Sequence, residues 1–201
     1  MTRKRTTFSA GDNQSRLIVK AVGAGRGLVL APPSGATWTM AQTVSGDGGV
    51  TKEGPGTLAF TAVPAFTGVL DVSEGIVSFD GLSVAGMRLK GSGTVSGGTL
   101  ASCTYKVAME DGGNVPEALD FSGVAFAGRT KVDLGRAEET ALSKPYASDV
   151  LVATYSGSAP DVSGWRVVNT GVPGLVGSFT AANGEIRMDL TETTSTVIFF
   201  R

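Results

Sequence analysis

Short apolar segments separated by glycines run through most of this chain, and this punctuation limits the folds that it can adopt. The 201 residues include 29 glycines, and threonine and valine are abundant. Glycine weakens a helix interior, whereas β-branched residues favour strands. No segment has a convincing helical period, and only Arg136–Leu142 could form a turn or two of helix. We therefore predict an all-β fold.

Thirteen segments have the length and residue types of short strands, and several alternate apolar with polar residues. They are Leu17–Val22, Leu28–Leu30, Thr37–Thr43, Thr57–Phe60, Val69–Val72, Ile76–Phe79, Met87–Leu89, Tyr105–Met109, Ala118–Phe121, Val150–Thr154, Trp165–Val168, Ile186–Leu190 and Thr196–Phe200.

Many short strands are compatible with a sandwich, a closed barrel or a solenoid. Asn-Gly and Asp-Gly hairpin turns are rare here, and regularly placed single glycines fill most gaps, as at the corners of a coil. The segment Gly54-Pro55-Gly56-Thr57-Leu58 recurs after 37 residues as Gly91-Ser92-Gly93-Thr94-Val95, and Gly97-Gly98-Thr99-Leu100 echoes it. Repeats of this period favour a solenoid.

Residues 44–79 carry a more specific pattern. Its parts are Gly49-Val50-Thr51-Lys52, Gly54, Gly56-Thr57-Leu58, Phe60, Phe66-Thr67-Gly68, Val72 and Gly75. This pattern resembles the autotransporter-associated β-strand repeat, also called the passenger-associated transport repeat. The sequence departs from the usual pattern after Gly68, where Val69-Leu70 replace a glycine and a threonine, and Ile76-Val77 replace the common Thr-Leu. Residues 150–190 resemble the ends of such secreted repeat proteins more loosely.

The resemblance implies a right-handed parallel β-helix displayed outside a bacterial cell. We expect a flexible basic segment over 1–15, the β-helix over 16–145, and a less regular C-terminal β portion or cap of the same domain over 146–201. Leu58, Phe60, Val72 and Ile76 should stack in the interior, and threonines should form ladders on the outer face.

Composition excludes several chemistries. There is no histidine, so Ser-His-Asp and Cys-His catalysis and His-ligated zinc are excluded, and the single Cys103 cannot form a disulfide framework. The net charge is −1, which argues against a global polyanion-binding surface and so against nucleic-acid binding. No apolar run is long enough to span a membrane, and no signal peptide is visible, which leaves an excised fragment or a cytosolic chain. The resemblance to a secreted repeat favours the fragment.

No catalytic, cofactor-binding or metal-binding residue is assigned. A glycan lyase or hydrolase would need clustered carboxylates, and the sequence offers only scattered pairs. These pairs are Asp47 with Glu53, Asp71 with Glu74, Glu110-Asp111, Glu138-Glu139 and Asp189 with Glu192. Asp111-Gly112-Gly113-Asn114 is the best calcium candidate, but it lacks the spacing of a calcium loop, and we interpret it as a turn.

Other chemistry-bearing residues also favour structural roles. Gly23-Ala24-Gly25-Arg26-Gly27 lacks the Gly-Lys-Ser/Thr of a phosphate loop and is expected to form a corner. Trp38 and Trp165 are expected in the core or covering an end, although exposed aromatics would suit sugar stacking. Cys103 is expected to be a small buried residue.

We predict a non-enzymatic extracellular or cell-surface structural, passenger or adhesion module of a bacterium. The alternatives are a β-helical polysaccharide lyase or hydrolase and a carbohydrate-binding module. Self-association through solenoid ends and contact with a cell surface or glycan are the expected partnerships, with no membrane span. The apolar strand Thr196–Phe200 is expected to pair internally; the alternative is pairing with Leu17–Val22 of another copy. The basic residues of 1–26 are interpreted as a solvated tail and first strand, or as an anionic contact.

Overall fold

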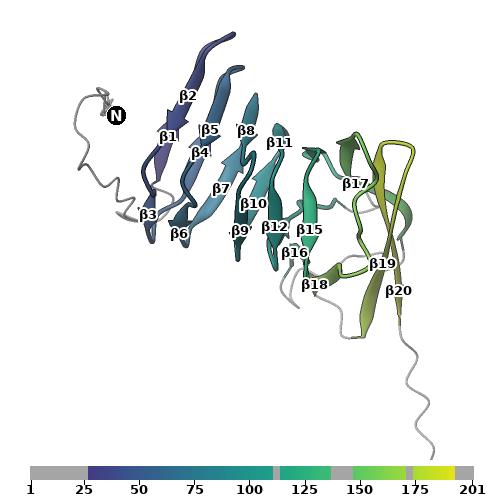
Figure 1. The fold of residues 1–201 in the computed structure, drawn as a ribbon. Helices are drawn as coiled ribbons and strands as arrows, with labels where there is room; N and C mark the ends of the chain where they lie inside the picture. Colours follow the sequence, from purple (N-terminus) through teal and green to yellow (C-terminus); the bar gives the residue numbers. More distant parts are fainter. Residues whose placement is uncertain (1–26, 111–113, 137–146, 171–173, 193–201) are drawn as a thin grey trace, which may run out of the picture.

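The computed structural model describes residues 27–110, 114–136, 147–170 and 174–192. Within these ranges the secondary structure consists of strands β1 to β20, and there is no helix (Figure 1). The all-β prediction is confirmed. None of the described residues belongs to a helix long and apolar enough to cross a membrane. The expected strands Leu17–Val22 and Thr196–Phe200 lie outside the described residues, as does 137–142 of the suggested helix.

The largest parallel array is a seven-stranded sheet, with the order β1-β4-β7-β10-β13-β16-β18. All its neighbouring strands are parallel. The strands are β1 (Leu28–Leu30), β4 (Val50–Lys52), β7 (Val69–Val72), β10 (Arg88–Gly91), β13 (Thr104–Lys106), β16 (Lys131–Arg136) and β18 (Arg166–Thr170).

A second sheet of eight strands has the order β19-β20-β17-β14-β11-β8-β5-β2, and its last three strands in chain order pair antiparallel. The strands are β2 (Thr37–Met40), β5 (Thr57–Phe60), β8 (Ile76–Ser78), β11 (Thr94–Ser96), β14 (Leu119–Ser122), β17 (Ala147–Ser156), β19 (Leu175–Ala182) and β20 (Glu185–Glu192). Two small parallel sheets complete the fold: β9 (Ser83–Ala85), β12 (Thr99–Ala101) and β15 (Ala125–Ala127), and β3 (Ser45–Gly46) with β6 (Ala65–Phe66).

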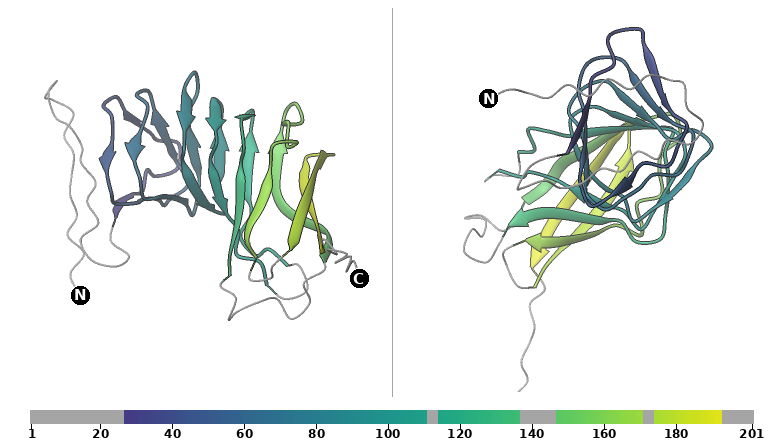
Figure 2. Two further views of the ribbon diagram at one scale, coloured as in Figure 1. Left: turned by 90° about the horizontal axis from the view of Figure 1, so that it is seen from below. Right: turned by 90° about the vertical axis from the view of Figure 1, so that its left-hand side faces the viewer.

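The chain visits these sheets in the same order several times, and each visit is called a pass below. Successive passes are β1–β3, β4–β6, β7–β9, β10–β12 and β13–β15, followed by β16 and β17. In a view along the row that the successive passes form, the strands of one pass lie behind those of the pass before it (Figure 2, right). Thr57 pairs with Ile76, and Ile76 pairs with Thr94. The 37-residue repeat of the sequence therefore spans two passes rather than one.

Alternation along each strand directs one set of side chains inward. Leu58, Val77 and Val95 lie in register on β5, β8 and β11, and none of the three is exposed. Phe60 and Val72 are also buried, as expected. The expectation for Ile76 is wrong, because its side chain is 37% exposed and its neighbour Val77 takes the interior position. In a strand of period two, only one of two adjacent apolar residues can face the core.

Trp38 occupies the same register position as Leu58, but it lies on β2, the last strand of its sheet. Among the described residues it is therefore packed from one side only, and at 41% exposure it covers the end of the inward column. Trp165 is buried near the opposite end of the row. Its ring packs edge-on against Phe126 and Phe179, with ring centroids 5.0 and 5.5 Å away. Aromatic side chains thus fill this end of the interior, next to the antiparallel hairpin β19–β20 that contributes Phe179.

Candidate functional site

The outer side of the seven-stranded sheet gathers charge. On β10, β13 and β16, the central residues Leu89, Tyr105 and Val132 are fully buried, so the residues on either side of each face outward. The outward residues form what we call the basic face. Its members are Arg88 and Lys90 on β10, Thr104 and Lys106 on β13, Lys131 and Asp133 on β16, and Arg166 on β18. Adjacent β7 contributes Asp71.

The other outer surfaces have a different character. On the eight-stranded sheet, hydroxyls stack in register: Ser78, Ser96, Ser122 and Ser156 occupy one line. The hydroxyl oxygens of Ser122 and Ser156 are 2.7 Å apart, and Thr154 donates to Asp120 Oδ1 at 3.0 Å. The three-stranded sheet presents only small residues, such as Ala85 and Ala101. Among the described residues, the outward cations are concentrated on the seven-stranded sheet, whereas Arg187 on β20 of the eight-stranded sheet is paired with Asp149 and Glu185 at 3.0 and 2.9 Å.

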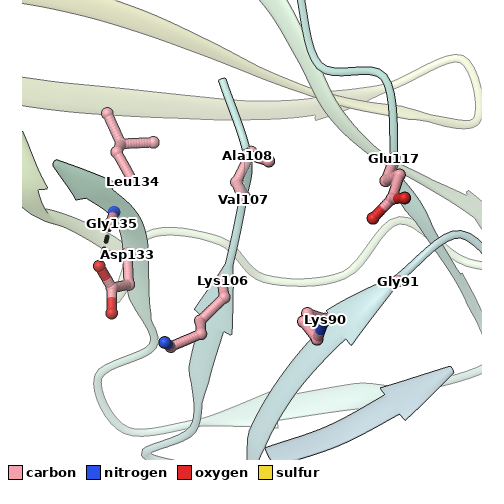
Figure 3. Close-up of a pocket in the computed structure, with 9 residues that line it drawn as sticks. All are labelled: Lys90, Gly91, Lys106, Val107, Ala108, Glu117, Asp133, Leu134 and Gly135. Atoms are coloured by element: carbon pink, nitrogen blue, oxygen red, sulfur yellow. Dashed lines mark hydrogen bonds between the residues drawn. The ribbon is translucent and has the colours of Figure 1, made fainter. Parts of the chain in front are cut away.

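Two shallow cavities lie on the basic face. One, of about 280 Å³, is lined by the residues drawn in Figure 3: Lys90, Gly91, Lys106, Val107, Ala108, Glu117, Asp133, Leu134 and Gly135. The other, of about 370 Å³, is lined by Arg88, Thr104, Lys131, Asp133, Val168 and Asn169. Asp133 borders both, so the cavities are neighbouring parts of one surface. Each combines cationic side chains with a carboxylate.

Asp133 is held in place by its strand. Its side chain is mostly buried, and its Oδ1 accepts hydrogen bonds from the backbone N–H of Gly135 at 2.9 Å and from Asn169 Nδ2 at 2.8 Å. The register between β16 and β18 shifts after Asp133, and Gly135 has a φ of +64°. Such bulges redirect side chains and often lie next to functional sites. Both donors are neutral, so these hydrogen bonds orient the carboxylate without pairing it with a cation.

The cations of the basic face differ in their partners. Lys90 forms an ion pair with Asp71, with Nζ 2.7 Å from Oδ2. Arg166 turns back and donates to the carbonyl oxygens of Trp165 and Ser163 at 2.6 and 3.0 Å. Arg88, Lys106 and Lys131 form no ion pair with any other residue that the structure describes. Three cations are therefore available to an external anion.

Lys52, the first residue of the Lys-x-Gly-x-Gly motif, has a structural position instead. It lies in register with the inward residues Leu30 and Val72, and it is fully buried. Its Nζ donates to the carbonyl oxygens of Gly54, Glu74 and Glu53 at 2.6, 2.9 and 3.2 Å. Burial lowers the pKa of Lys52, because desolvation disfavours the ammonium, while the charge of Glu74 acts in the opposite direction.

The carboxylate pairs singled out in the sequence do not line either cavity. Asp71 belongs to the margin of the basic face, where Ser73 Oγ also donates to its Oδ1 at 3.2 Å, and exposed Glu74 lies in the corner after β7. Asp189 accepts a hydrogen bond from the backbone N–H of Asp149 at 2.7 Å, on the antiparallel part of the fold. Asp47 and Glu53 lie on other segments. Glu138-Glu139 lie outside the described residues.

The calcium candidate is only partly described. Residues 111–113 lie outside the described ranges, and Asn114 Nδ2 donates to Glu110 Oε2 at 2.8 Å. Among the described residues, no three His, Cys, Asp or Glu side chains are grouped as a metal site would require. Residues 23–26 of the glycine-rich segment also lie outside the described ranges.

Cys103 is fully buried, as expected, and its Sγ lies 3.4 Å from the Thr130 hydroxyl. Burial raises the pKa of the thiol and so disfavours the reactive thiolate.

Sequence reasoning missed the basic face, together with Glu117 and Asp133. A signal for it exists in the short segments Arg88-Leu89-Lys90, Thr104-Tyr105-Lys106 and Lys131-Val132-Asp133. Each has one buried residue between two polar ones, but only the parallel register shows that the three lie side by side.

No protein-family model matches the chain, and no curated protein matches it significantly.

Proposed function

We propose that this chain is a non-enzymatic structural, passenger or adhesion module displayed outside a bacterial cell and built on a right-handed parallel β-helix. The observation that carries the proposal is the repeated parallel register, in which β1, β4, β7, β10, β13 and β16 stack in one sheet and β2, β5, β8, β11 and β14 stack in another. A stack of this kind forms a stiff, extended body, because each pass buries its apolar side against its neighbours.

The resemblance of residues 44–79 to the autotransporter-associated repeat supports the extracellular part of the proposal. Several residues of its motif lie at a corner between strands. Lys52 and the motif glycines form the corner between β4 and β5, and Ile76 N–H donates to Gly56 O at 3.2 Å across to the next pass. Residues that seemed specific to the repeat are therefore those that allow one pass to lie on another.

A glycan lyase or hydrolase is the second candidate, and one cavity favours it. Glu117 and Asp133 line the same cavity as Lys90 and Lys106, so two carboxylates and two cations share one space (Figure 3). General acid–base catalysis on a polysaccharide uses groups of these types. We place this function second because the cavity is shallow and the two carboxylates lie outside any recognised catalytic motif.

Surface labelling of cells tests the proposed location. An epitope inserted after the exposed Ser158, in a bacterium that expresses the gene, should bind antibody equally well on intact and on permeabilised cells. Labelling only after permeabilisation would contradict an extracellular module.

Turnover assays test the second candidate. The purified chain should release no reducing ends or unsaturated products from acidic or neutral polysaccharides. Activity that disappears in Asp133→Asn but persists in Asp189→Asn would establish an enzyme at the cavity.

A further inference from the structure

We infer that the basic face binds a linear polysaccharide that carries carboxylate or sulfate groups, laid across strands β10, β13, β16 and β18. This inference deepens the proposed function. It rests on the proposed extracellular location only for the place where the protein would meet such a polysaccharide. Binding can be measured on the purified chain alone, whatever its location in the cell.

The first support is the arrangement of the cations. One line across the sheet contains Arg88, Thr104, Lys131 and Arg166, and a second contains Lys90, Lys106 and Asp133. Neighbouring strands of a sheet lie about 4.8 Å apart. This spacing is close to the length of one sugar unit in an extended polysaccharide. A glycan running across the strands therefore meets a new side chain at nearly every sugar.

The second support is the availability of those cations. Arg88, Lys106 and Lys131 have no ion-pair partner among the described residues, and they lie on three successive strands. Arginine can hold a carboxylate or sulfate through two parallel N–H donors, and lysine acts as a point charge. A polysaccharide with one anionic group on every sugar, or on every second sugar, suits this spacing.

The third support is the presence of acids within the face, which distinguishes a glycan from a nucleic acid. Glu117 and Asp133 line the same cavity as Lys90 and Lys106. They would repel a dense row of phosphates, whereas they can accept hydrogen bonds from sugar hydroxyls. The exposed large hydrophobic residues include Trp38, which is on β2, and none is on the basic face. Aromatic stacking platforms, whether for bases or for sugar rings, are therefore missing from the described part of this face, so a ligand here would be held by charge and hydrogen bonds.

A matched pair of ligands tests the inference. Binding of the purified full chain is measured by calorimetry to polygalacturonate oligosaccharides and to the same oligosaccharides after methyl esterification, which removes the charge but keeps the sugar. We expect binding to the acidic form alone, weakening as salt is raised.

Matched variants locate the binding. Lys106→Gln combined with Lys131→Gln should weaken binding about tenfold, because two charge-assisted contacts are lost. Arg129→Gln, an exposed cation in the segment before β16, should change it less than twofold. Circular dichroism of each variant checks that the fold is kept.

Three results with a bound ligand would overturn the inference. They are equal binding of the esterified oligosaccharide, equal weakening by Arg129→Gln, and tighter binding of a single-stranded oligonucleotide of the same charge. A complete lack of binding to polygalacturonate and to a sulfated glycan such as chondroitin sulfate would also overturn it. None of these results bears on surface labelling of the epitope, so the inference and the proposed function fail separately.

Discussion

Leu58 and Ile76 lie on adjacent strands of the eight-stranded sheet, yet their side chains meet opposite environments. Leu58 is fully buried, and Ile76 is 37% exposed. Leu58→Ala should lower the free energy of unfolding by about 2–5 kcal/mol, because a stacked interior cannot collapse into the cavity. Ile76→Ala should cost no more than about 1 kcal/mol. Denaturant unfolding measures both, and equal costs would contradict the assigned orientations of the two strands.

Lys52 is a buried cation whose ammonium satisfies three backbone carbonyl oxygens. Burial holds its pKa below the ordinary value, so between the folded and unfolded pKa values the unfolded chain binds more protons. The contribution of Lys52 to stability should therefore increase as the pH rises toward about 10.4. Comparing the unfolding free energies of the wild type and Lys52→Met over this range isolates the effect.

The matched control is Lys90→Met, which removes an exposed lysine from its pair with Asp71. This variant keeps Lys52, so its free energy of unfolding should still rise over the same pH range. A wild-type advantage over Lys52→Met that stays flat or falls would contradict the buried position of this ammonium.

At the scale of the element, the corner between β7 and β8 depends on Gly75. This residue has a φ of +69°, and a Cβ there would meet the carbonyl oxygens of Gly54 and Gly56, and Lys52 Nζ at 2.6 Å. Gly81 has a similar φ of +72° but open space around it. Gly81→Ala should cost about 1–2 kcal/mol from backbone strain alone. Gly75→Ala should cost about 1–3 kcal/mol more because of overpacking. Thermal unfolding of both variants checks this, and equal losses would mean that the passes are not stacked at this corner.

Strand prediction succeeded where large apolar residues are concentrated, even in the three residues of Leu28–Leu30. Leu28–Leu30, Thr57–Phe60 and Val69–Val72 were predicted with the bounds that the structure shows. The strands of the three-stranded sheet were missed. Each has a single large apolar residue between small ones, such as Leu100 between Thr99 and Ala101 on β12, whereas Leu28–Leu30 is apolar throughout. Its sequence therefore contains too weak an apolar signal to be recognised as a strand.

At the scale of the whole molecule, the chain has a net charge of −1, yet the cations Arg88, Lys90, Lys106, Lys131 and Arg166 share one side. Total charge could not reveal this, because the positions come together only through pairing of strands that are 16 to 35 residues apart in the sequence. The glycine motif in residues 44–79 predicted corners from local sequence. The candidate site depends on the parallel register of β10, β13, β16 and β18, which local sequence does not show. The boundary at residue 146 stays a prediction, while parallel pairing in the seven-stranded sheet reaches Thr170.

Parallel stacking of the passes can be tested by a distance between two spin labels. Thr37, Thr57, Ile76, Thr94, Asp120 and Thr154 follow one another on neighbouring strands of the eight-stranded sheet. Thr37 and Thr154 are therefore five strands apart, which corresponds to about 24 Å.

Pulsed electron paramagnetic resonance can measure this distance with labels at Thr37→Cys and Thr154→Cys in a Cys103→Ala background. Moving the second label to Asp120→Cys should shorten it by one strand spacing, about 5 Å. A parallel stack should give both a narrow distance distribution near 24 Å and a distance about 5 Å shorter when the second label is moved. A broad distribution, or a distance that does not shorten when the label moves to β14, would contradict the parallel stack.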